Sequence, residues 1–392
     1  MKKKILFVYY EMMTGGSTTS LLSLLYNFDY DKYDVDLLLY RNRGPFLKYI
    51  PDKVNLLPQA MFDQSSSGKI IKSVLNGELE RTYISGLKYH HKFMRMPQES
   101  AYMQAKLCRR IDTIYDVAIG YLELWSGVFV NQFIKAKKKI SWVHIDYEKA
   151  HYIPEIDQSR KTYNNSKYIV NVSDECLNNF NHSFPTLAKR TVMIENILTK
   201  SFVQKRLEDA PDRKLQLDDN ALKLLTVCRI AIDQKGLDRG LSVVSDLVKA
   251  GRSIQWFIVG DGPDKDAFLK MIKEKHAENH VFMLGAMNCP FKLYGKFDAF
   301  FLPSRFEGKP MAVTEAQMLG LPPIVAAYAS AYEQIEDTIT GIVSNNDTES
   351  LISTIEEVYD NPGLLKEVRH NLQNTNFDNV EEINKIYKLI EG

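Results

Sequence analysis

Residues 306–316 read FEGKPMAVTEA and place two carboxylates, Glu307 and Glu315, eight positions apart. The internal proline, and the glycine and prolines that follow the stretch, predict a helix over about residues 311–319. Glu307 then lies in the loop that enters the helix, and the side chain of Glu315 leans back toward the same end. Both carboxylates can face one crevice at the positive end of a helix dipole, which suits a ligand that carries phosphate beside hydroxyls.

The entry of this helix supplies further groups for an anion. Pro310 suits the first helical position, where its missing N–H costs nothing, and Gly320 suits the residue just past the end. Gly308 lets the backbone approach a ligand closely. With Lys309 and Met311 it forms the mouth of the helix, whose free N–H groups can hold a diphosphate. The charge of Lys309 either contacts phosphate or is simply exposed.

Four other blocks stand in order before this stretch, and each is an apolar run that ends in small or charged residues. They are LTVCRI at 225–230 with KGL at 235–237, FIVGDGP at 257–263, VFMLG at 281–285 and DAFFLPS at 298–304. Apolar runs that alternate with helical patterns predict an α/β fold with parallel sheets.

Together the five blocks resemble the signature of the retaining nucleotide-sugar glycosyltransferases of family 4 (glycosyl transferases group 1), which have the GT-B fold. The resemblance is strong over residues 223–345 and weak in the N-terminal half. It implies two Rossmann-like domains that face each other across a cleft, with acceptor binding by 1–198 and nucleotide-sugar binding by 199–378. It also implies that a last helix, at 379–392, crosses back to the N-terminal domain.

The remaining pattern agrees with two parallel sheets. We expect strands near 4–10, 34–40, 54–57, 116–121, 140–144, 168–172 and 191–194, and then near 224–229, 255–259, 281–284, 299–302, 323–326 and 341–343. Residues 199–220 are rich in charge and lack a strand pattern. We therefore expect them to be the linker between the domains.

Arg229, at the end of a predicted strand, and Lys235, at the start of the next predicted helix, are the candidate catalytic cations. When the bond from a sugar to a diphosphate breaks, negative charge builds on the leaving phosphate, and preorganised positive groups stabilise it. Ligands of open α/β sheets bind at strand ends, and an arginine can grip phosphate in a bidentate way. The alternative is a surface arginine and a helix-start lysine, but the resemblance places both beside the two glutamates.

The resemblance assigns Glu307 to hydroxyls of the donor sugar and Glu315 to the ribose of the nucleotide. A carboxylate accepts two hydroxyl hydrogen bonds, and a ribose offers a vicinal diol. By the same analogy, uracil or another base lies near Gly285 and Ala286, held partly by backbone. The structural alternatives are a helix-face charge for Glu315 and a carboxylate favoured by the helix dipole for Glu307.

Two places in the N-terminal half are candidate ligand sites. Gly15 and Gly16 follow the first predicted strand and precede a helical run, so the backbone can approach a ligand there; an ordinary β–α turn is the alternative. His144 closes a predicted strand and resembles the family's active-site histidine, which implies contact with a donor-sugar hydroxyl or the acceptor. A purely structural histidine is the alternative. Asp146 either orients it or is a loop carboxylate.

The stretches Asp29-x-Asp31 and Asp34-x-Asp36 have the spacing that metal-dependent transferases of the GT-A type use to bind a divalent cation. They flank a predicted strand far in sequence from the phosphate elements, so we interpret them as solvated turn residues. Because the helix dipole and the two candidate cations replace the charge of a metal, we expect neither a metal nor another cofactor.

The composition is ordinary for a globular protein of 392 residues, with 45% hydrophobic residues and a net charge of +1. The charge is uneven: residues 1–200 hold 28 Lys and Arg against 20 Asp and Glu, a net +8, and the remainder 22 against 29, a net −7. Four scattered cysteines predict neither disulfides nor a zinc site, which fits a reducing cytoplasm. The first apolar run is too short for a signal peptide, and no run approaches the ~18 residues of a membrane span.

Residues 61–110 stand apart because many Lys, Arg and His residues are interleaved with Ile, Leu, Tyr, Phe and Met. One interpretation is a basic amphipathic helical insertion that rests on an anionic membrane surface. The other is a set of helices packed on the N-terminal sheet with solvated lysines. The positive N-terminal half favours an anionic membrane or an acidic acceptor, with chance surface variation as the alternative.

These expectations combine into a cytoplasmic enzyme, peripheral at the inner face of the plasma membrane. It transfers a hexose or N-acetylhexosamine from a nucleotide-diphosphate sugar, with UDP as the expected carrier, to a saccharide acceptor. We expect that acceptor to be a lipid-linked oligosaccharide of capsule or other cell-surface polysaccharide synthesis, and we expect no nucleic acid partner. Two alternatives stay open: a nucleotide-sugar epimerase of GT-B fold and a non-catalytic GT-B partner subunit.

Overall fold

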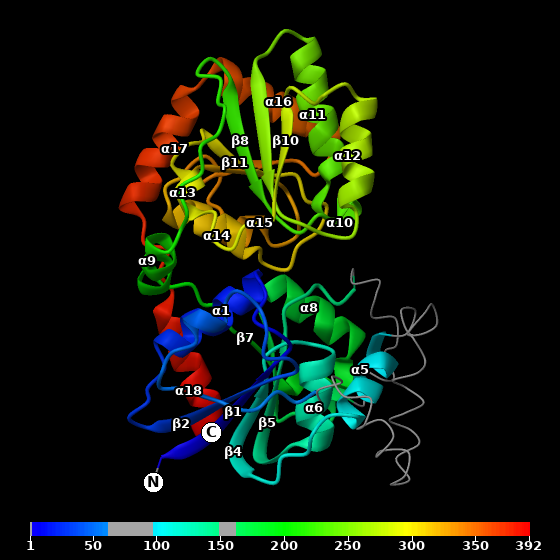
Figure 1. The fold of residues 1–392 in the computed structure, drawn as a ribbon, viewed down its shortest axis with the longest axis vertical. Coiled ribbons are helices and arrows are strands. Elements are labelled where there is room, and N and C mark those ends of the chain that lie inside the picture. The colour runs from blue at the N-terminus through cyan, green and yellow to red at the C-terminus, as the bar shows by residue number, and fades with distance from the viewer. Residues whose placement is uncertain (1, 62–96, 149–161) are drawn as a thin grey trace, which may run out of the picture. The chain divides into compact units, whose positions relative to one another are not determined.

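The structure is a computed structural model that describes residues 2–61, 97–148 and 162–392 (Figure 1). The chain divides into two compact units. Unit 1 holds Met1–Glu195 and Glu382–Gly392, and unit 2 holds Asn196–Glu381. The boundaries expected from the sequence fall after residues 198 and 378, close to these divisions.

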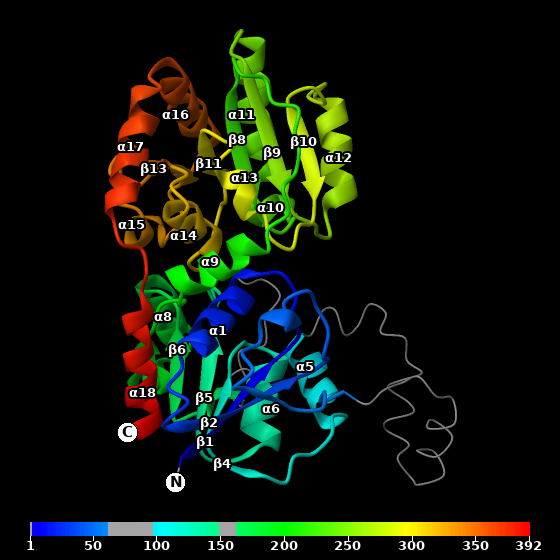
Figure 2. The ribbon, with the colours of Figure 1, turned by 60° about the vertical axis from the view of Figure 1, so that its left-hand side comes forward.

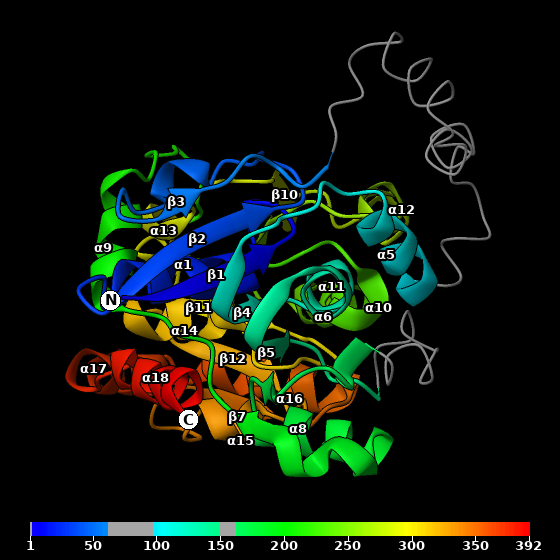
Figure 3. The same cartoon turned by 90° about the horizontal axis from the view of Figure 1, so that it is seen from below.

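Among the described residues, seven parallel strands form the sheet of unit 1, in the order β3-β2-β1-β4-β5-β6-β7 (Figure 3). They are β1 (Lys3–Tyr9), β2 (Tyr33–Leu39), β3 (Asn55–Leu56), β4 (Ile114–Gly120), β5 (Lys135–Val143), β6 (Tyr168–Asn171) and β7 (Thr191–Met193). Each coincides with a predicted strand. The run Ile5–Tyr9 is buried throughout, as expected for a parallel strand covered on both faces.

The described α-helices of unit 1 are α1 (Gly16–Tyr26), α5 (Pro97–Lys106), α6 (Trp125–Phe133), α8 (Asp174–Ser183) and α18 (Ile383–Glu391). The chain runs from β1 to β2 on one side and returns to β4 on the other, so the order of the strands reverses between β1 and β4. The carboxyl ends of strands at such a switch point are where open α/β sheets bind ligands. Of the predicted insertion at 61–110, residues 62–96 lie outside the described residues.

The last helix belongs to unit 1, as the resemblance implies. Ile383, Ile386 and Ile390 on α18 are buried. The ring of Tyr387 stacks on that of Tyr33 with centroids 5.4 Å apart. Strand β5 begins earlier than predicted, and its lysine-rich start has partners in the fold. Lys138 Nζ, for example, donates to the backbone oxygens of residues 389 and 390 on α18.

Six described strands form the sheet of unit 2, all parallel, in the order β10-β9-β8-β11-β12-β13. They are β8 (Leu222–Val227), β9 (Ile254–Val259), β10 (Val281–Gly285), β11 (Ala299–Leu302), β12 (Pro323–Ala326) and β13 (Ile342–Ser344), and each coincides with a predicted strand. Its helices are α9 (Lys200–Glu208), α10 (Ile232–Lys235), α11 (Leu237–Lys249), α12 (Lys265–Glu274), α13 (Phe291–Tyr294), α14 (Met311–Met318), α15 (Ala331–Gln334), α16 (Thr348–Asp360) and α17 (Gly363–Asn374) (Figure 2).

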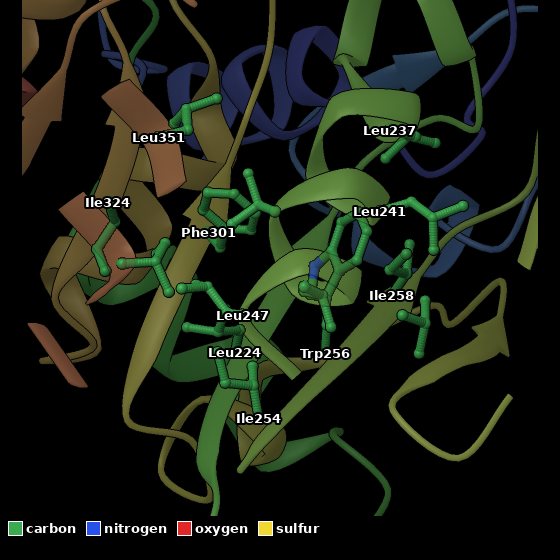
Figure 4. Packing of buried hydrophobic residues seen from close by; sticks show 14 of the residues in the cluster. Leu224, Leu237, Leu241, Leu247, Ile254, Trp256, Ile258, Phe301, Ile324 and Leu351 are labelled. Atoms are coloured by element: carbon green, nitrogen blue, oxygen red, sulfur yellow. The ribbon is translucent and has the colours of Figure 1, made fainter. Parts of the chain in front are cut away.

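Two apolar clusters hold unit 2 together, one on each face of its sheet. The first joins the sheet to α11, α12 and α16 around Trp256 (Figure 4). The indole N–H of Trp256 donates to Thr226 Oγ1 at 2.7 Å. The second joins the sheet to α9, α13 and α14 through residues such as Val203 and Phe291. The stretch 199–220, predicted as a linker, therefore begins with a helix that packs into unit 2 as part of its core.

Candidate functional site

The loop after β8 carries the two predicted cations. Arg229 follows the end of the strand by two residues. Lys235, predicted at the start of the next helix, is instead the last residue of the one-turn helix α10. Gly236 separates α10 from α11 with a φ of +59°. A Cβ at Gly236 would lie 1.8 Å from the carbonyl oxygen of Pro303, so glycine alone allows α10 to lie this close to the loop after β11.

Lys235 and Glu307 form a buried ion pair across these two loops. Lys235 Nζ donates to Glu307 Oε1 at 2.7 Å and to Oε2 at 2.8 Å. Ser304 Oγ donates to Glu307 Oε1 at 2.6 Å. The Lys235 side chain is 14% exposed and that of Glu307 is 6% exposed. The sequence assigns these residues to different parts of a ligand, whereas in the structure each neutralises the other.

Arg229, six residues before Lys235 in the same loop region, is exposed to solvent. Its Nη2 donates to the side-chain oxygen of Gln234 at 2.8 Å. Burial raises the pKa of the Cys228 thiol to about 12, and the charges of Lys235, Glu307 and Arg229 all act on this group. The charges of all three predicted catalytic residues of unit 2 therefore act on one thiol at the carboxyl end of β8.

Helix α14 begins at Met311, as predicted, and ends one residue earlier than predicted, at Met318. Pro310 is not the first helical residue: it is the N-cap, with extended backbone (φ −71°, ψ 114°). Its ring fixes φ, and the extended ψ turns the chain into the helix. Gly320 follows the helix with a φ of +73°, as expected for a residue past the C-terminus. Gly308, like Lys309, is half-buried at the entry.

Glu315 is buried on α14 and pairs with a residue that sequence reasoning missed. Arg206 Nη1, from α9, donates to Glu315 Oε1 at 3.1 Å. Burial raises the pKa of the Glu315 carboxyl, and the charge and hydrogen bond of Arg206 oppose that shift. Arg206 was missed because it lies in the stretch predicted as a linker. An arginine in a helical pattern there was the available signal.

The predicted base-binding loop begins where β10 ends. Gly285 is the last residue of β10 and has a φ of +75°, and Ala286 after it is exposed. Arg213 Nη1 donates to the carbonyl oxygen of Leu284 at 2.9 Å. This loop follows β10, the loop with Arg229 follows β8, and the loop that enters α14 follows β11. All three therefore lie at the carboxyl ends of strands of one sheet, where open α/β sheets bind ligands.

In unit 1, Gly15 is the N-cap of α1 and Gly16 is its first residue. The turn is tied to β1 because the hydroxyl of Tyr9 lies 2.7 Å from Ser17 Oγ and 3.1 Å from Thr18 Oγ1. Burial raises the pKa of the Tyr9 phenol to about 12, so it stays neutral. The two glycines thus lie at the carboxyl end of β1, beside the switch point of the sheet.

His144 follows β5, and its ring is held by backbone. A carbonyl oxygen only accepts, so His144 Nε2 donates to Tyr121 O at 3.1 Å. The His144 N–H donates to Glu123 Oε2 at 3.0 Å. The oxygen Oδ1 of Asp146, a candidate to orient the ring, accepts from the N–H of Glu148 at 3.1 Å.

Glu123 is a second residue that sequence reasoning missed. It is 7% exposed, and burial raises the pKa of its carboxyl. The next residue, Leu124, has a φ of +59°, a conformation that side chains rarely adopt. Backbone strain of this kind is common beside functional sites. The position of Glu123, just past the end of β4, was the signal in the sequence that could have identified it.

The Asp-x-Asp pairs have structural partners. Asp29 Oδ2 lies 2.8 Å from Lys32 Nζ, as expected for a turn. The prediction of a solvated turn residue is wrong for Asp36, which lies on β2 and is 5% exposed. Its carboxylate accepts from the Asn55 amide and the Tyr115 hydroxyl, both at 2.8 Å. Within residues 2–61, 97–148 and 162–392, no group of three metal-binding side chains occurs, and no helix is long and apolar enough to cross a membrane.

The whole chain has the GT-B fold of glycosyltransferases. It matches Alr3699/HepE of Anabaena in complex with UDP at a TM-score of 0.64, with 17% identity and 100% of both chains covered. It matches a TarM variant of Staphylococcus aureus in complex with fondaparinux, alpha-GlcNAc-glycerol and UDP at a TM-score of 0.67, with 14% identity and 100% of both chains covered. Identities this low establish the fold alone.

Residues 208–377 match the family model described as glycosyl transferases group 1, so the predicted resemblance to that group is confirmed over this segment. Alpha-D-kanosaminyltransferase of Streptomyces kanamyceticus is 28% identical over 158 residues, 40% of each chain. Poly(ribitol-phosphate) alpha-N-acetylglucosaminyltransferase of S. aureus is 28% identical over 179 residues, 44% of this chain and 34% of the relative. The chain thus aligns with less than two thirds of the length of these relatives.

Proposed function

We propose that this protein is a retaining glycosyltransferase of family 4 that uses a nucleotide-diphosphate sugar as donor. The observation that carries the proposal is the buried Lys235–Glu307 pair, with Arg229 beside it, at the carboxyl end of the unit 2 sheet. Catalysis requires positive charge where the leaving phosphate develops negative charge. Arg229 is exposed and charged, so its guanidinium can meet that phosphate.

The contacts of Lys235 and Glu307 suggest how they divide the work. An ammonium group has three N–H donors, and Lys235 directs two hydrogen bonds at Glu307. The third is available to a phosphate oxygen. Glu307 is oriented by Lys235 and Ser304, so it is preorganised to accept hydrogen bonds from hydroxyls of the donor sugar.

In this proposal the rest of the nucleotide contacts α14 and the loop after β10. We assign the diphosphate to the entry of α14, at Gly308 to Met311, because the first turn of a helix points N–H groups and the positive end of its dipole at an anion. Glu315 takes the ribose diol, and the loop at Gly285 and Ala286 takes the base. UDP is the carrier we propose, and the solved structures of similar fold that contain UDP support this choice.

Unit 1 is the proposed acceptor-binding unit, with Gly15, Gly16 and His144 at its switch point. We propose a saccharide acceptor, a lipid-linked oligosaccharide in cell-surface polysaccharide synthesis, and a hexose or N-acetylhexosamine as the sugar transferred. The net charge of +8 in residues 1–200 supports an anionic neighbour, such as a lipid-linked acceptor at the inner face of the plasma membrane. We further propose that the reaction needs no metal.

The direct test is transfer from UDP-hexoses and UDP-N-acetylhexosamines to a panel of saccharide and lipid-linked acceptors, with EDTA present in parallel reactions. We expect one donor to be consumed with release of UDP, undiminished by EDTA. The product should keep the anomeric configuration of the donor, as read by the anomeric coupling in its NMR spectrum. An inverted product would refute the retaining mechanism.

Two controls separate the other candidates. A donor incubated without acceptor yields a new UDP-sugar only if the protein is an epimerase. Absence of UDP binding in calorimetry would favour the alternative of a non-catalytic partner subunit. Either result would count against the proposal.

A further inference from the structure

Arg206 is a buried arginine that holds the proposed ribose-binding carboxylate. It lies on α9, and its side chain is 2% exposed. Its Nη1 donates to Glu315 Oε1 at 3.1 Å, and its Nη2 donates to the carbonyl oxygen of Asn288 at 3.3 Å. Its guanidinium carbon lies 4.3 Å from the centroid of the Phe291 ring. The planar group is therefore held at its edge by oxygens and on its face by an aromatic ring.

These contacts join three segments that flank the proposed nucleotide site. The first is α9 itself, anchored in the core of unit 2 by Val203. The second is the loop 286–290, where Asn288 accepts from Arg206 and the Cys289 thiol donates to the Arg206 carbonyl oxygen at 3.1 Å. The third is α14, through Glu315. One side chain therefore contacts the loop proposed for the base and the carboxylate proposed for the ribose.

The environment of Glu315 makes this contact important. Burial favours the neutral acid and raises the pKa of Glu315, whereas Arg206 favours the carboxylate. The other titratable groups that interact with Glu315 are the Tyr294 phenol on α13 and the Cys289 thiol, and burial raises the pKa of both, so they stay neutral. Among the described residues, Arg206 is the cation that favours the charged form of Glu315.

A charged and fixed Glu315 is what recognition of a ribose requires. An ionised carboxylate accepts hydrogen bonds from both hydroxyls of a vicinal diol, whereas the protonated acid must also place its own donor. A lysine at position 206 could supply charge but not the planar fork that contacts Glu315 and Asn288 together.

We propose that Arg206 is a positioning residue for the nucleotide: it holds Glu315 and the loop 286–290 in the arrangement that binds the ribose diol. This inference rests on the proposed function, because it assumes that Glu315 meets a ribose. A purely structural arginine would stabilise unit 2 without any preference for ligands that carry ribose hydroxyls.

The experiment compares UDP with 2′,3′-dideoxy-UDP, which lacks both hydroxyls, by calorimetry on the full chain and its variants. For Arg206→Lys we expect UDP affinity to fall at least tenfold and dideoxy-UDP affinity by a clearly smaller factor, since both ligands share the contact with the base loop and only UDP has the diol. Glu315→Gln should reduce the ratio of the two affinities in the same way. Adding Arg206→Lys to Glu315→Gln should change the ratio no further.

Arg252 supplies a matched control. It also binds carboxylates, with Nη2 3.2 Å from Glu356 and 2.8 Å from Asp360, and its guanidinium carbon lies 5.3 Å from the centroid of the Tyr359 ring. Arg252 lies just before β9, at the amino end of that strand, whereas the proposed nucleotide site lies at the carboxyl ends of the strands. Arg252→Lys should therefore leave both affinities unchanged.

Each outcome decides one question. If the unchanged protein does not bind UDP, the proposed function fails. If it binds UDP but Arg206→Lys leaves both affinities unchanged, or weakens both equally, the inference on Arg206 is wrong. Should Arg206→Lys fail to fold, Phe291→Leu serves as the second variant, since it removes the aromatic face and keeps the charge pair. A smaller loss confined to UDP supports the proposal there, and an equal loss for both ligands overturns it.

Discussion

Lys235 Nζ lies 2.7 and 2.8 Å from the two carboxylate oxygens of Glu307, on loops that are 72 residues apart in the chain. Both side chains are largely buried. Removal of one partner therefore leaves the other as a buried charge without compensation, which costs far more than loss of the pair's net attraction. The same two groups serve the proposed chemistry, so stability and turnover are coupled at this point.

Lys235→Ala should lower the free energy of unfolding of unit 2 by about 3–5 kcal/mol because Glu307 stays buried and unpaired. Glu307→Gln should cost less, because the amide oxygen still accepts from Lys235. Both should reduce the rate of sugar transfer by about 10²-fold or more. Urea unfolding and initial rates measure the two effects. A Lys235→Ala protein as stable as the unchanged chain would show that the ion pair does not form.

Arg229→Ala should separate function from stability. The side chain is exposed, so its loss should change the free energy of unfolding by no more than about 0.5 kcal/mol. Transfer should nevertheless fall by about 10²–10³-fold if the guanidinium meets the leaving phosphate. Lys265→Ala, in the same unit, is the control for loss of a surface cation and should leave the rate unchanged. Equal rates for Arg229→Ala and Lys265→Ala would remove Arg229 from the catalytic site.

Gly236→Ala tests the close packing that brings Lys235 to Glu307. Gly251 has a similarly left-handed φ of +86°, but a Cβ there meets nothing within 4 Å. Gly251→Ala should therefore cost only the backbone strain of about 1–2 kcal/mol. Gly236→Ala should cost this and a further ~1–3 kcal/mol of overpacking, because its methyl would collide with the Pro303 carbonyl. Thermal unfolding of both variants gives the difference, and equal losses would contradict the packing.

The sequence predicts most of the strands well because they contain continuous apolar runs that become buried, as Ile5–Tyr9 and Ala299–Leu302 are. It also places α14, since glycine and proline mark helix ends through backbone geometry that is local. Such features depend on neighbours in the chain, and one sequence contains them in full.

The partners of the site residues were not predictable in this way. Arg206 and Glu315 are 109 residues apart, and Lys235 and Glu307 are 72 apart. Nothing local selects these pairs, since they depend on how helices and loops from distant parts of the chain pack at one edge of a sheet. Glu123 is intermediate: its position just past β4 could have marked it, but its contact with the His144 N–H requires the fold.

Glu123→Gln should reveal its buried carboxyl through pH. The folded-state pKa is raised above the ordinary value of about 4.3, so the carboxylate form is disfavoured in the folded protein. A group of this kind gives its full stability below its unfolded pKa and loses it as pH rises through its folded pKa. Glutamine stays neutral and can still accept from the His144 N–H.

The stability of Glu123→Gln relative to the unchanged protein should therefore increase as pH rises from about 4 through the raised pKa, and then level off. Carboxyls with lowered pKa values, such as Asp116 beside Lys137, are common to both proteins and cancel in the difference. Urea unfolding across this pH range measures it. A difference that does not vary with pH would mean that the Glu123 pKa is not raised.

Ile386→Ala tests whether α18 stabilises unit 1. Ile386 is fully buried, so its truncation should cost about 2–5 kcal/mol. Lys388→Ala on the exposed face of the same helix is the control and should cost little. Because Tyr387 stacks on Tyr33 of β2, the loss should appear as faster amide hydrogen exchange in β1 and β2. Exchange in β8 and β9 of unit 2 should stay unchanged. Faster exchange in unit 2 alone would show that α18 does not stabilise unit 1.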